Sequence, residues 1–294
     1  MRMTSILIIS VVLLFAIYVA SIFVPSLFFY KRGYHASMLA GKQIVAHRGG
    51  AQLAPENSLL AIEKGILSGA DIIEIDIHQT LDKAIVVCHD PTLNRTTTGK
   101  GKIAEMTLAQ IKQYNIIDQN GKATAERIAT LQQVLDLVES YRAKGSDVKM
   151  LIEIKHASGQ YPGIEQRLVD EIRRRDAFGW CTAQSFADPV LLTLHSLCPK
   201  LRIEKLLLFR LPGLPLIVDG FSITRFSYEK YHFVSSFNMM WQGANRSLID
   251  DIHRHGKEVK LWTMQGTDAP VLDADGFITD RPDLWMCSRE ALAN

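Results

Sequence analysis

Residues 71–78, which read DIIEIDIH, decide the fold together with residues 149–155, which read KMLIEIK. Successive side chains of a β-strand point to opposite faces, so Glu74 and Asp76 share one face and three isoleucines share the other. Glu153 and Lys155 repeat this pattern on the second stretch. Either strand alone is also compatible with acids on a solvated face. Two such strands, each with acids near its carboxyl end, favour a barrel that carries charge where its parallel strands end.

Strand-like runs recur after residue 40, and helix-like stretches separate most of them. Eight runs are predicted to be strands: 43–47, 71–78, 149–155, 181–186, 202–208, 232–237, 258–263 and 276–279. Five stretches are predicted to be helices: 58–68, 130–143, 164–175, 189–197 and 245–256. Eight strands that alternate with helices over about 250 residues predict an α/β fold, a TIM-type (β/α)8 barrel rather than an open sheet.

One segment breaks this alternation. Asp76 and Ile85 are too close in sequence for a crossover between parallel strands, which needs a dozen or more residues. The run that begins at Ile85 must therefore fold back as a hairpin, which places His89 roughly across from Glu74. The following residues are rich in threonine and glycine, and we expect a small insertion, about 80–125, between the second strand and its helix.

Composition limits the class of protein. The 294 residues carry a formal net charge of +2, and no basic excess indicates a nucleic-acid partner. Charged residues make up 22% and hydrophobic residues 47%, which is typical of a folded core. The four cysteines are scattered and lack the spacing of a zinc site or of a disulfide framework.

The first 32 residues differ from the rest of the chain. About 25 residues, 6–30, carry no charge, which is long enough to cross a bilayer. We predict a single-pass transmembrane anchor at 1–32, a linker at 33–42 and the barrel domain at 43–294. A cleaved signal peptide is the alternative, but the apolar run is longer than a typical signal core. Positive charges flank both ends of the run, so the side of the membrane is left open.

The residues at the strand ends suit phosphoryl chemistry. Glu74, Asp76 and Glu153 form a hard oxygen set that favours one divalent cation, Mg²⁺ or Ca²⁺ with Mn²⁺ as a further candidate. His47 and His89 can serve as general acid and general base near neutral pH, although a lone histidine at a strand end is more often a packed core residue.

Short motifs that contain these residues follow one another in a fixed order: His47-Arg48-Gly49, Pro55-Glu56-Asn57, Glu74-Ile75-Asp76, His89-Asp90, Glu153-Ile154-Lys155, Ser185-Phe186, Trp262-Thr263 and Ile278-Thr279-Asp280-Arg281-Pro282. The ordered set, which spans roughly residues 43 to 283, resembles the glycerophosphodiester phosphodiesterase (GDPD) family.

The resemblance implies a barrel enzyme, a phosphoric diester hydrolase that cleaves glycerophosphodiesters to an alcohol and glycerol 3-phosphate. It implies that Glu74, Asp76 and Glu153 bind the metal and that His47 and His89 transfer protons. It also implies that Arg48 and Lys155 hold phosphate and that Trp262 lines the substrate site. In this family the substrate's own glycerol hydroxyl is thought to attack phosphorus, and water then opens the cyclic phosphate.

Two alternative functions remain open. One is a lysophospholipase D that acts on lysoglycerophospholipids, and the other is a non-catalytic barrel that binds phosphate esters. The expected partner is accordingly a small-molecule or lysolipid phosphodiester, with the membrane reached through the N-terminal helix. The apolar loop 209–218 follows a strand and should lie over the mouth of the barrel, where it either packs against a helix or contacts an acyl chain or the bilayer.

Overall fold

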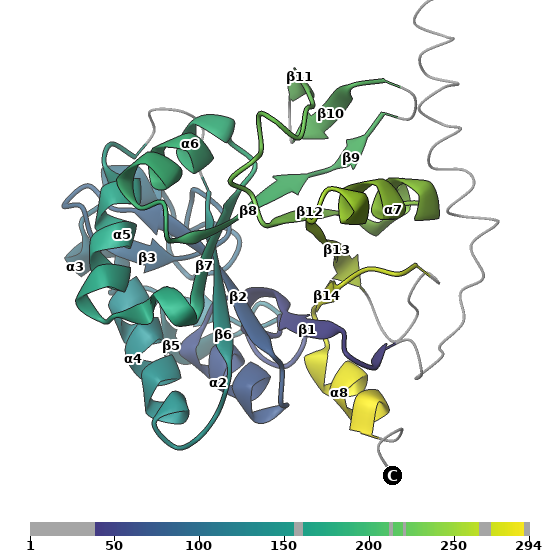
Figure 1. Cartoon of the computed structure of the whole chain (residues 1–294). Helices are drawn as coiled ribbons and strands as arrows, with labels where there is room; N and C mark the ends of the chain where they lie inside the picture. Colours follow the sequence, from purple (N-terminus) through teal and green to yellow (C-terminus); the bar gives the residue numbers. More distant parts are fainter. Residues whose placement is uncertain (1–38, 156–160, 212–213, 220–221, 265–271, 291–294) are drawn as a thin grey trace, which may run out of the picture.

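The computed structural model describes residues 39–155, 161–211, 214–219, 222–264 and 272–290 (Figure 1). The predicted anchor at 1–32 and most of the predicted linker lie outside this set. Within the described residues, every helix is too short or too polar to span a bilayer.

Eight parallel strands close into a barrel, as predicted (Figure 1). The sheet closes because β1 pairs with β14 on one side and with β2 on the other. In their order around the barrel, the strands are β1 (Gln43–Ala46), β2 (Ile72–Gln79), β6 (Lys149–Ile154), β7 (Cys181–Ser185), β8 (Arg202–Leu207), β12 (Ser236–Met240), β13 (Glu258–Met264) and β14 (Gly276–Thr279).

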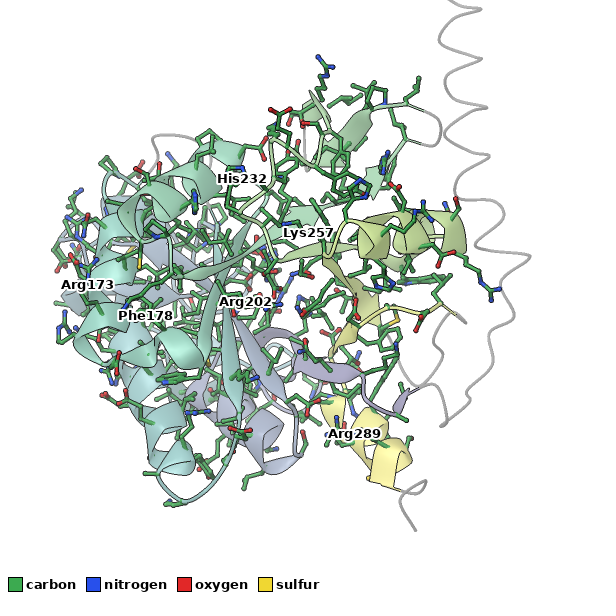
Figure 2. All side chains as sticks on the ribbon, viewed as in Figure 1. Arg173, Phe178, Arg202, His232, Lys257 and Arg289 are labelled. Carbon is green, nitrogen blue, oxygen red and sulfur yellow. The ribbon has the colours of Figure 1, made fainter. Side chains whose placement is uncertain are left out.

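Helices cover the outside of the barrel. They are α2 (Leu59–Leu67), α4 (Leu131–Arg142), α5 (Ile164–Arg174), α6 (Asp188–Leu197), α7 (Arg246–Arg254) and α8 (Pro282–Glu290). Several begin at a side chain that accepts an otherwise unpaired helix N–H: Ser58 at α2, Asn245 at α7, and Thr130 at α4, where Gln133 completes a capping box. At α8, Arg289 (labelled in Figure 2) forms ion pairs with Asp71, just before β2.

The alternation of side chains on β2 sorts charge from apolar surface. Ile73, Ile75 and Ile77 are fully buried in the main core between strands and helices. Glu74 and Asp76 therefore face the barrel interior, as the strand periodicity predicts. A small apolar group shares the same interior: Val45, Ile72, Leu151 and Ile278, with Trp262 packed against it.

The predicted insertion has its own fold. Strand β3 (Ile85–Val87) runs antiparallel to the end of β2, as predicted. Ile77 is aligned with Val87, so the hairpin register differs by one residue from the predicted alignment of His89 with Glu74. The insertion continues through η3 (Ile103–Glu105), α3 (Leu108–Ile111), β4 (Asn115–Ile117) and β5 (Ala123–Arg127), and it has a separate apolar core.

Two sequence-based expectations about the chain between 209 and 240 were wrong. Residues 232–237 were predicted to be a strand, but β12 begins only at Ser236, because Tyr231 and Val234 are buried in a turn that precedes it. The expected loop 209–218 instead forms most of a three-stranded antiparallel sheet. Its strands are β9 (Phe209–Arg210), β10 (Leu216–Asp219) and β11 (Ser222–Arg225), and they lie beside the carboxyl end of β8 (Figure 1).

Candidate active site

A pocket of about 240 Å³ opens where the barrel strands end. One wall is charged and the other is apolar, so the pocket suits a ligand with a phosphate at one end. The charged wall is made by His47, Arg48, Glu74, His89, Glu153 and Lys155, and the rest by Gln184, Phe186, Leu206, Trp262, Thr263 and Ile278. All the predicted site residues line this pocket except Asp76, which is buried beside Glu74 and Glu153.

Three buried carboxylates meet at the base of the charged wall. Glu74, Asp76 and Glu153 each offer an oxygen within 4.8 Å of the other two, and their exposures are only 2%, 1% and 5%. Burial, followed by the charges of Asp76 and Glu153, raises the pKa of Glu74 well above its usual value. Burial also raises the pKa of Glu153 to about 7, against the opposing charge of Lys155. For Asp76, burial is outweighed by the nearby charges of Lys155, His89 and Arg48, which hold its pKa well below the usual range. The carboxylates whose charge the surroundings do not offset are therefore Glu74 and Glu153.

This donor set fits a divalent cation. Asp76 Oδ1 is buried and has no hydrogen-bond partner among the described residues, although Lys155 Nζ lies 3.2 Å away. Three carboxylates without cysteine or histidine suit a hard ion such as Mg²⁺, Ca²⁺ or Mn²⁺. The triad could therefore hold a metal, and its donor set fits all three of these ions.

Two cations face the triad. Lys155 Nζ lies 2.9 Å from Glu153 Oε1 as well as against Asp76. Arg48 Nη1 donates to Glu56 Oε1 at 2.8 Å, and its Nε lies 3.6 Å from Asp76 Oδ2. Both side chains thus line the pocket while contacting carboxylates, and their predicted contact with phosphate remains a prediction.

The turn that carries His47 and Arg48 is held by close packing. Arg48 has a φ of 52°, and its backbone N–H donates to Glu74 Oε2 at 2.9 Å. A Cβ at Gly65 of α2 would lie 2.4 Å from the Gly49 carbonyl oxygen, so glycine is required for this approach. The turn is therefore pressed between α2 and the triad.

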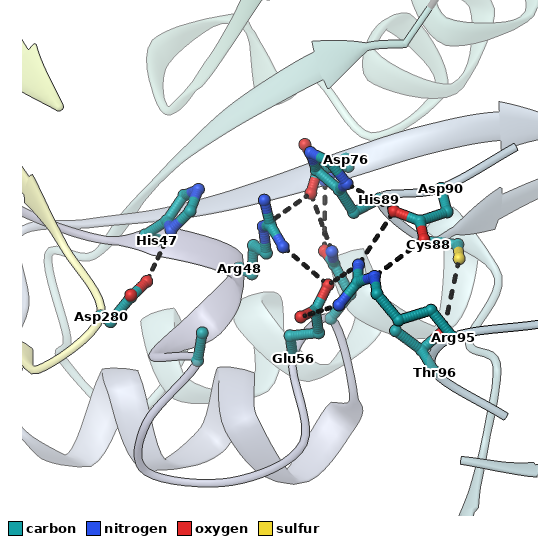
Figure 3. Close-up of polar contacts among 12 residues, drawn as sticks. His47, Arg48, Glu56, Asp76, Cys88, His89, Asp90, Arg95, Thr96 and Asp280 are labelled. Carbon is teal, nitrogen blue, oxygen red and sulfur yellow. Dashed lines mark hydrogen bonds and ion pairs between the residues drawn. The ribbon is translucent and has the colours of Figure 1, made fainter. Parts of the chain in front are cut away.

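Each predicted catalytic histidine is paired with an aspartate. His47 Nδ1 lies 2.6 Å from Asp280 Oδ1, and His89 Nδ1 lies 2.7 Å from Asp90 Oδ1 (Figure 3). Each carboxylate accepts a hydrogen bond from Nδ1–H, so the Nε2 atom of each ring is left for substrate. Figure 3 shows Arg48 between His47 and the Asp76–His89 region.

A chain of ion pairs supports His89. Arg95 donates to both Asp90 and Glu56, and Glu56 also accepts from Arg48. The hydrogen bond from Arg95 holds the pKa of Asp90 well below its usual range. Burial lowers the pKa of His89, and the charges of Lys155 and Arg48 act in the same direction. His89 is therefore neutral near pH 7 and able to accept a proton.

The apolar wall is aromatic. The rings of Phe186 and Trp262 stand perpendicular, with centroids 6.0 Å apart. Trp262 Nε1 is buried without a hydrogen-bond partner among the described residues. Trp262 thus lines this pocket with an unused donor, and its contact with substrate remains a prediction.

Several residues of the site carried no predicted role: Asn57, Glu56, Asp90, Arg95, Gln184 and Asp280. Asn57 is buried and grips Asp76, donating to Oδ2 at 2.8 Å and accepting the Asp76 N–H at 3.2 Å. The role of Asp280 could have been inferred. In a closed barrel the first and last strands pair, so the residue after β14 meets the residue after β1, and Ala46 is indeed aligned with Thr279.

The model of the glycerophosphoryl diester phosphodiesterase family matches residues 47–284. A glycerophosphodiester phosphodiesterase from Caldanaerobacter subterraneus subsp. tengcongensis is 30% identical over 245 residues, which cover 82% of this chain and 94% of that protein. A second glycerophosphodiester phosphodiesterase, from Bacillus altitudinis, is 28% identical, and the match covers 85% of this chain and 99% of that protein. A solved structure of an Oleispira antarctica phosphodiesterase in complex with the product sn-glycerol-3-phosphate has a similar fold, with a TM-score of 0.70 and 20% identity. The match covers 86% of this chain and 99% of that chain.

Proposed function

The chain belongs to the glycerophosphoryl diester phosphodiesterase family, and from this premise we propose that it cleaves glycerophosphodiesters to an alcohol and glycerol 3-phosphate with a divalent cation and two histidines. Relatives that match it over nearly their whole length are named glycerophosphodiester phosphodiesterases, so the chain is a phosphoric diester hydrolase by family. The observation that carries the proposal is a single pocket with two carboxylate-paired histidines beside a buried acidic triad.

His89 is assigned as the general base and His47 as the general acid. Burial keeps His89 neutral, so its Nε2 can accept the proton of the attacking glycerol hydroxyl. His47, held through Nδ1 by Asp280, then donates a proton from Nε2 to the leaving alcohol oxygen. In the second step the roles reverse, and His47 activates the water that opens the cyclic phosphate.

Glu74, Asp76 and Glu153 would hold the cation, which when bound stabilises negative charge on the phosphoryl oxygens. Arg48 and Lys155 line the same wall and can contact the remaining phosphate oxygens, Arg48 through its planar fork. Trp262 closes the pocket against the carbon skeleton of the substrate and offers its Nε1–H to a hydroxyl.

Release of glycerol 3-phosphate from a panel of glycerophosphodiesters tests the proposal. The purified chain is first treated with chelator and then assayed with and without Mg²⁺, Ca²⁺ or Mn²⁺. Metal-dependent release of glycerol 3-phosphate supports the proposed reaction. Tight binding of the esters without turnover would instead favour the non-catalytic barrel.

Lysoglycerophospholipids are a second candidate substrate class, and a groove of about 510 Å³ between β9–β10 and α7 favours it. Leu206 lines the pocket and Arg210 lines the groove, and four residues of chain span at most about 14 Å. The distance from the pocket to the groove, measured between these two residues, is thus at most about half of the ~30 Å hydrocarbon thickness of a bilayer. An acyl chain that starts in the pocket can therefore reach the groove. The apolar part of the groove comprises Leu211, Leu214, Pro215 and Leu248.

A membrane location remains part of this second proposal. Its support is the uncharged run at 6–30, which is long enough for a single-pass anchor. Cell fractionation followed by alkaline extraction tests the anchor: the full chain should stay in the membrane pellet. Recovery of the full chain in the supernatant would remove the anchor from the proposal and leave the chemistry untouched.

A further inference from the structure

A line of buried polar side chains runs from the acidic triad into the barrel interior. Gln184 Nε2 donates to Glu74 Oε1 at 3.4 Å, and Asn238 Nδ2 donates to Gln184 Oε1 at 2.8 Å. Asn238 Nδ2 also donates to Glu204 Oε2 at 2.8 Å, and Lys260 Nζ donates to Glu204 Oε1 at 2.7 Å. Gln184, Asn238, Glu204 and Lys260 are all at most 2% exposed.

The connections fix the orientation of both amides. Asn238 gives both Nδ2 hydrogens to Gln184 and Glu204, while its Oδ1 accepts from Ser236 Oγ at 2.9 Å. A flipped Asn238 would place its carbonyl oxygen against the Glu204 carboxylate. Since Asn238 occupies Gln184 Oε1, the Gln184 NH₂ group must face Glu74 and the pocket, which Gln184 lines.

The far end of the line is an ion pair that the reaction does not use. Glu204 and Lys260 project into the interior from β8 and β13, and the intervening strand β12 supplies Asn238. Arg202, labelled in Figure 2, lies 3.4 Å from Glu204 and also pairs with Glu258 at the base of the barrel. A buried ion pair is seldom more stabilising than apolar side chains of the same volume, so packing alone does not account for this pair.

We propose that Glu204 and Lys260 are positioning residues for the metal site, which act through Asn238 and Gln184 to hold Glu74 in the conformation that binds the cation. The inference rests on the proposed function, because it presumes that the triad binds a divalent ion. Hydrogen-bond partners of metal-binding carboxylates commonly contribute about 10–100-fold to metal affinity.

The test is a titration of chelator-treated protein with Mn²⁺. Binding is measured by calorimetry and by the electron paramagnetic resonance signal of the free ion. Glu204→Leu with Lys260→Met removes both charges together and leaves no unpaired buried ion. This double variant should bind Mn²⁺ about 10–100-fold more weakly, with little change in the melting temperature of the metal-free protein. Gln184→Leu, which breaks the line next to Glu74, should weaken binding by a similar factor.

The matched control is the other buried lysine pair of β8. Lys205 points away from the interior and lies 3.1 Å from both Asp219 and Asp188, and Asp188 keeps Lys230 as a second partner. Lys205→Met with Asp219→Leu therefore removes a buried pair outside the line and should leave Mn²⁺ affinity unchanged. Wild-type affinity in folded Gln184→Leu would overturn the inference, even if the double variant failed to fold. A wild-type chain that binds no divalent ion would overturn the proposed metal chemistry and this inference with it.

Discussion

Two clusters of buried charged side chains share the interior of this barrel, the acidic triad and the Glu204–Lys260 pair, and they differ in how their charge is balanced. Glu204 is fully enclosed, yet its pKa is lowered, because Lys260, Asn238 and Arg202 outweigh the effect of burial. Glu74 is equally enclosed, yet its pKa is raised well above the usual value, because burial and two neighbouring carboxylates outweigh its donors. The two residues are therefore distinguished by the charges around them and not by their burial.

The position of each cluster along the strands agrees with this difference. The unbalanced triad lies toward the strand ends, at a pocket that also exposes two histidines. Glu204 and Lys260 lie below it on β8 and β13, outside the residues that line the pocket. In parallel barrels the carboxyl ends carry the chemistry, and deeper positions contribute to stability and support.

The largest expected effect is a loss of turnover, and only substitutions at the pocket beside the acidic triad should cause it. His47→Ala and His89→Ala should each lower kcat by about 10²–10⁴-fold, because each removes a proton-transfer group. Steady-state kinetics at saturating metal, with circular dichroism to verify folding, measure this. His232→Ala, at an exposed histidine, is the control and should keep wild-type kcat. Near-normal turnover in either active-site variant would remove that histidine from the mechanism.

Neutralising one acid in each cluster should change stability in opposite directions. Glu204→Gln leaves Lys260 without its buried partner and should lower the free energy of unfolding by about 3 kcal/mol. Glu153→Gln removes a carboxylate whose pKa is raised by burial, keeps an oxygen for Lys155, and should raise the free energy of unfolding of the metal-free protein by about 1 kcal/mol. Urea denaturation of both variants in chelator measures the two changes. Equal destabilisation would mean that the triad is balanced after all, and the comparison would break.

The pH dependence of stability should sharpen the comparison further. Glu153 has a pKa of about 7 in the folded chain, against about 4.3 when unfolded. The stability that protonated Glu153 contributes to the folded chain is therefore fully present below about pH 4.3 and is lost as pH rises through 7. The lowered pKa of Glu204 keeps that residue ionised throughout this window. Melting temperatures of metal-free protein should fall from pH 5 to pH 8, and Mg²⁺ should restore more stability at pH 8. Glu153→Gln is the matching control and should show a shallower fall, because it retains the raised pKa of Glu74.

The smallest expected effect concerns the groove beside β9–β10. Leu214 is 45% exposed and lines the groove, so Leu214→Ser should raise KM for lysophospholipids a few-fold and spare water-soluble glycerophosphodiesters. Ile223, on β11, is 53% exposed but does not line the groove, and Ile223→Ser is the control. Equal KM values for lipid in the two variants would leave the groove without a role in substrate binding.

Features that depend on residues close together in the sequence could be predicted from local periodicity and spacing. The alternation of side chains on β2 and β6 was enough to predict that Glu74, Asp76 and Glu153 face one interior. The short stretch between β2 and β3 was enough to predict the hairpin. The β-like residues 232–235 misled the prediction because burial of Tyr231 and Val234 in a turn depends on tertiary packing.

Pairings between distant segments could not be predicted in the same way. The contact of Arg95 with Glu56 depends on how the insertion folds back over the barrel. The Glu204–Lys260 pair requires knowing both which strands neighbour β12 and the register of each. The small sheet β9–β11 likewise forms largely from a segment that was expected to be an apolar loop.

The central claim is that the uncompensated triad binds one divalent cation. Isothermal titration of chelator-treated protein with Mn²⁺ at pH 7.5 tests it most directly, with Glu74→Gln and Glu204→Gln run beside the wild type. We predict one site per chain in the wild type, loss of that site in Glu74→Gln, and a weakened but intact site in Glu204→Gln. Absence of binding in the wild type, together with full turnover after exhaustive chelation, would contradict the claim.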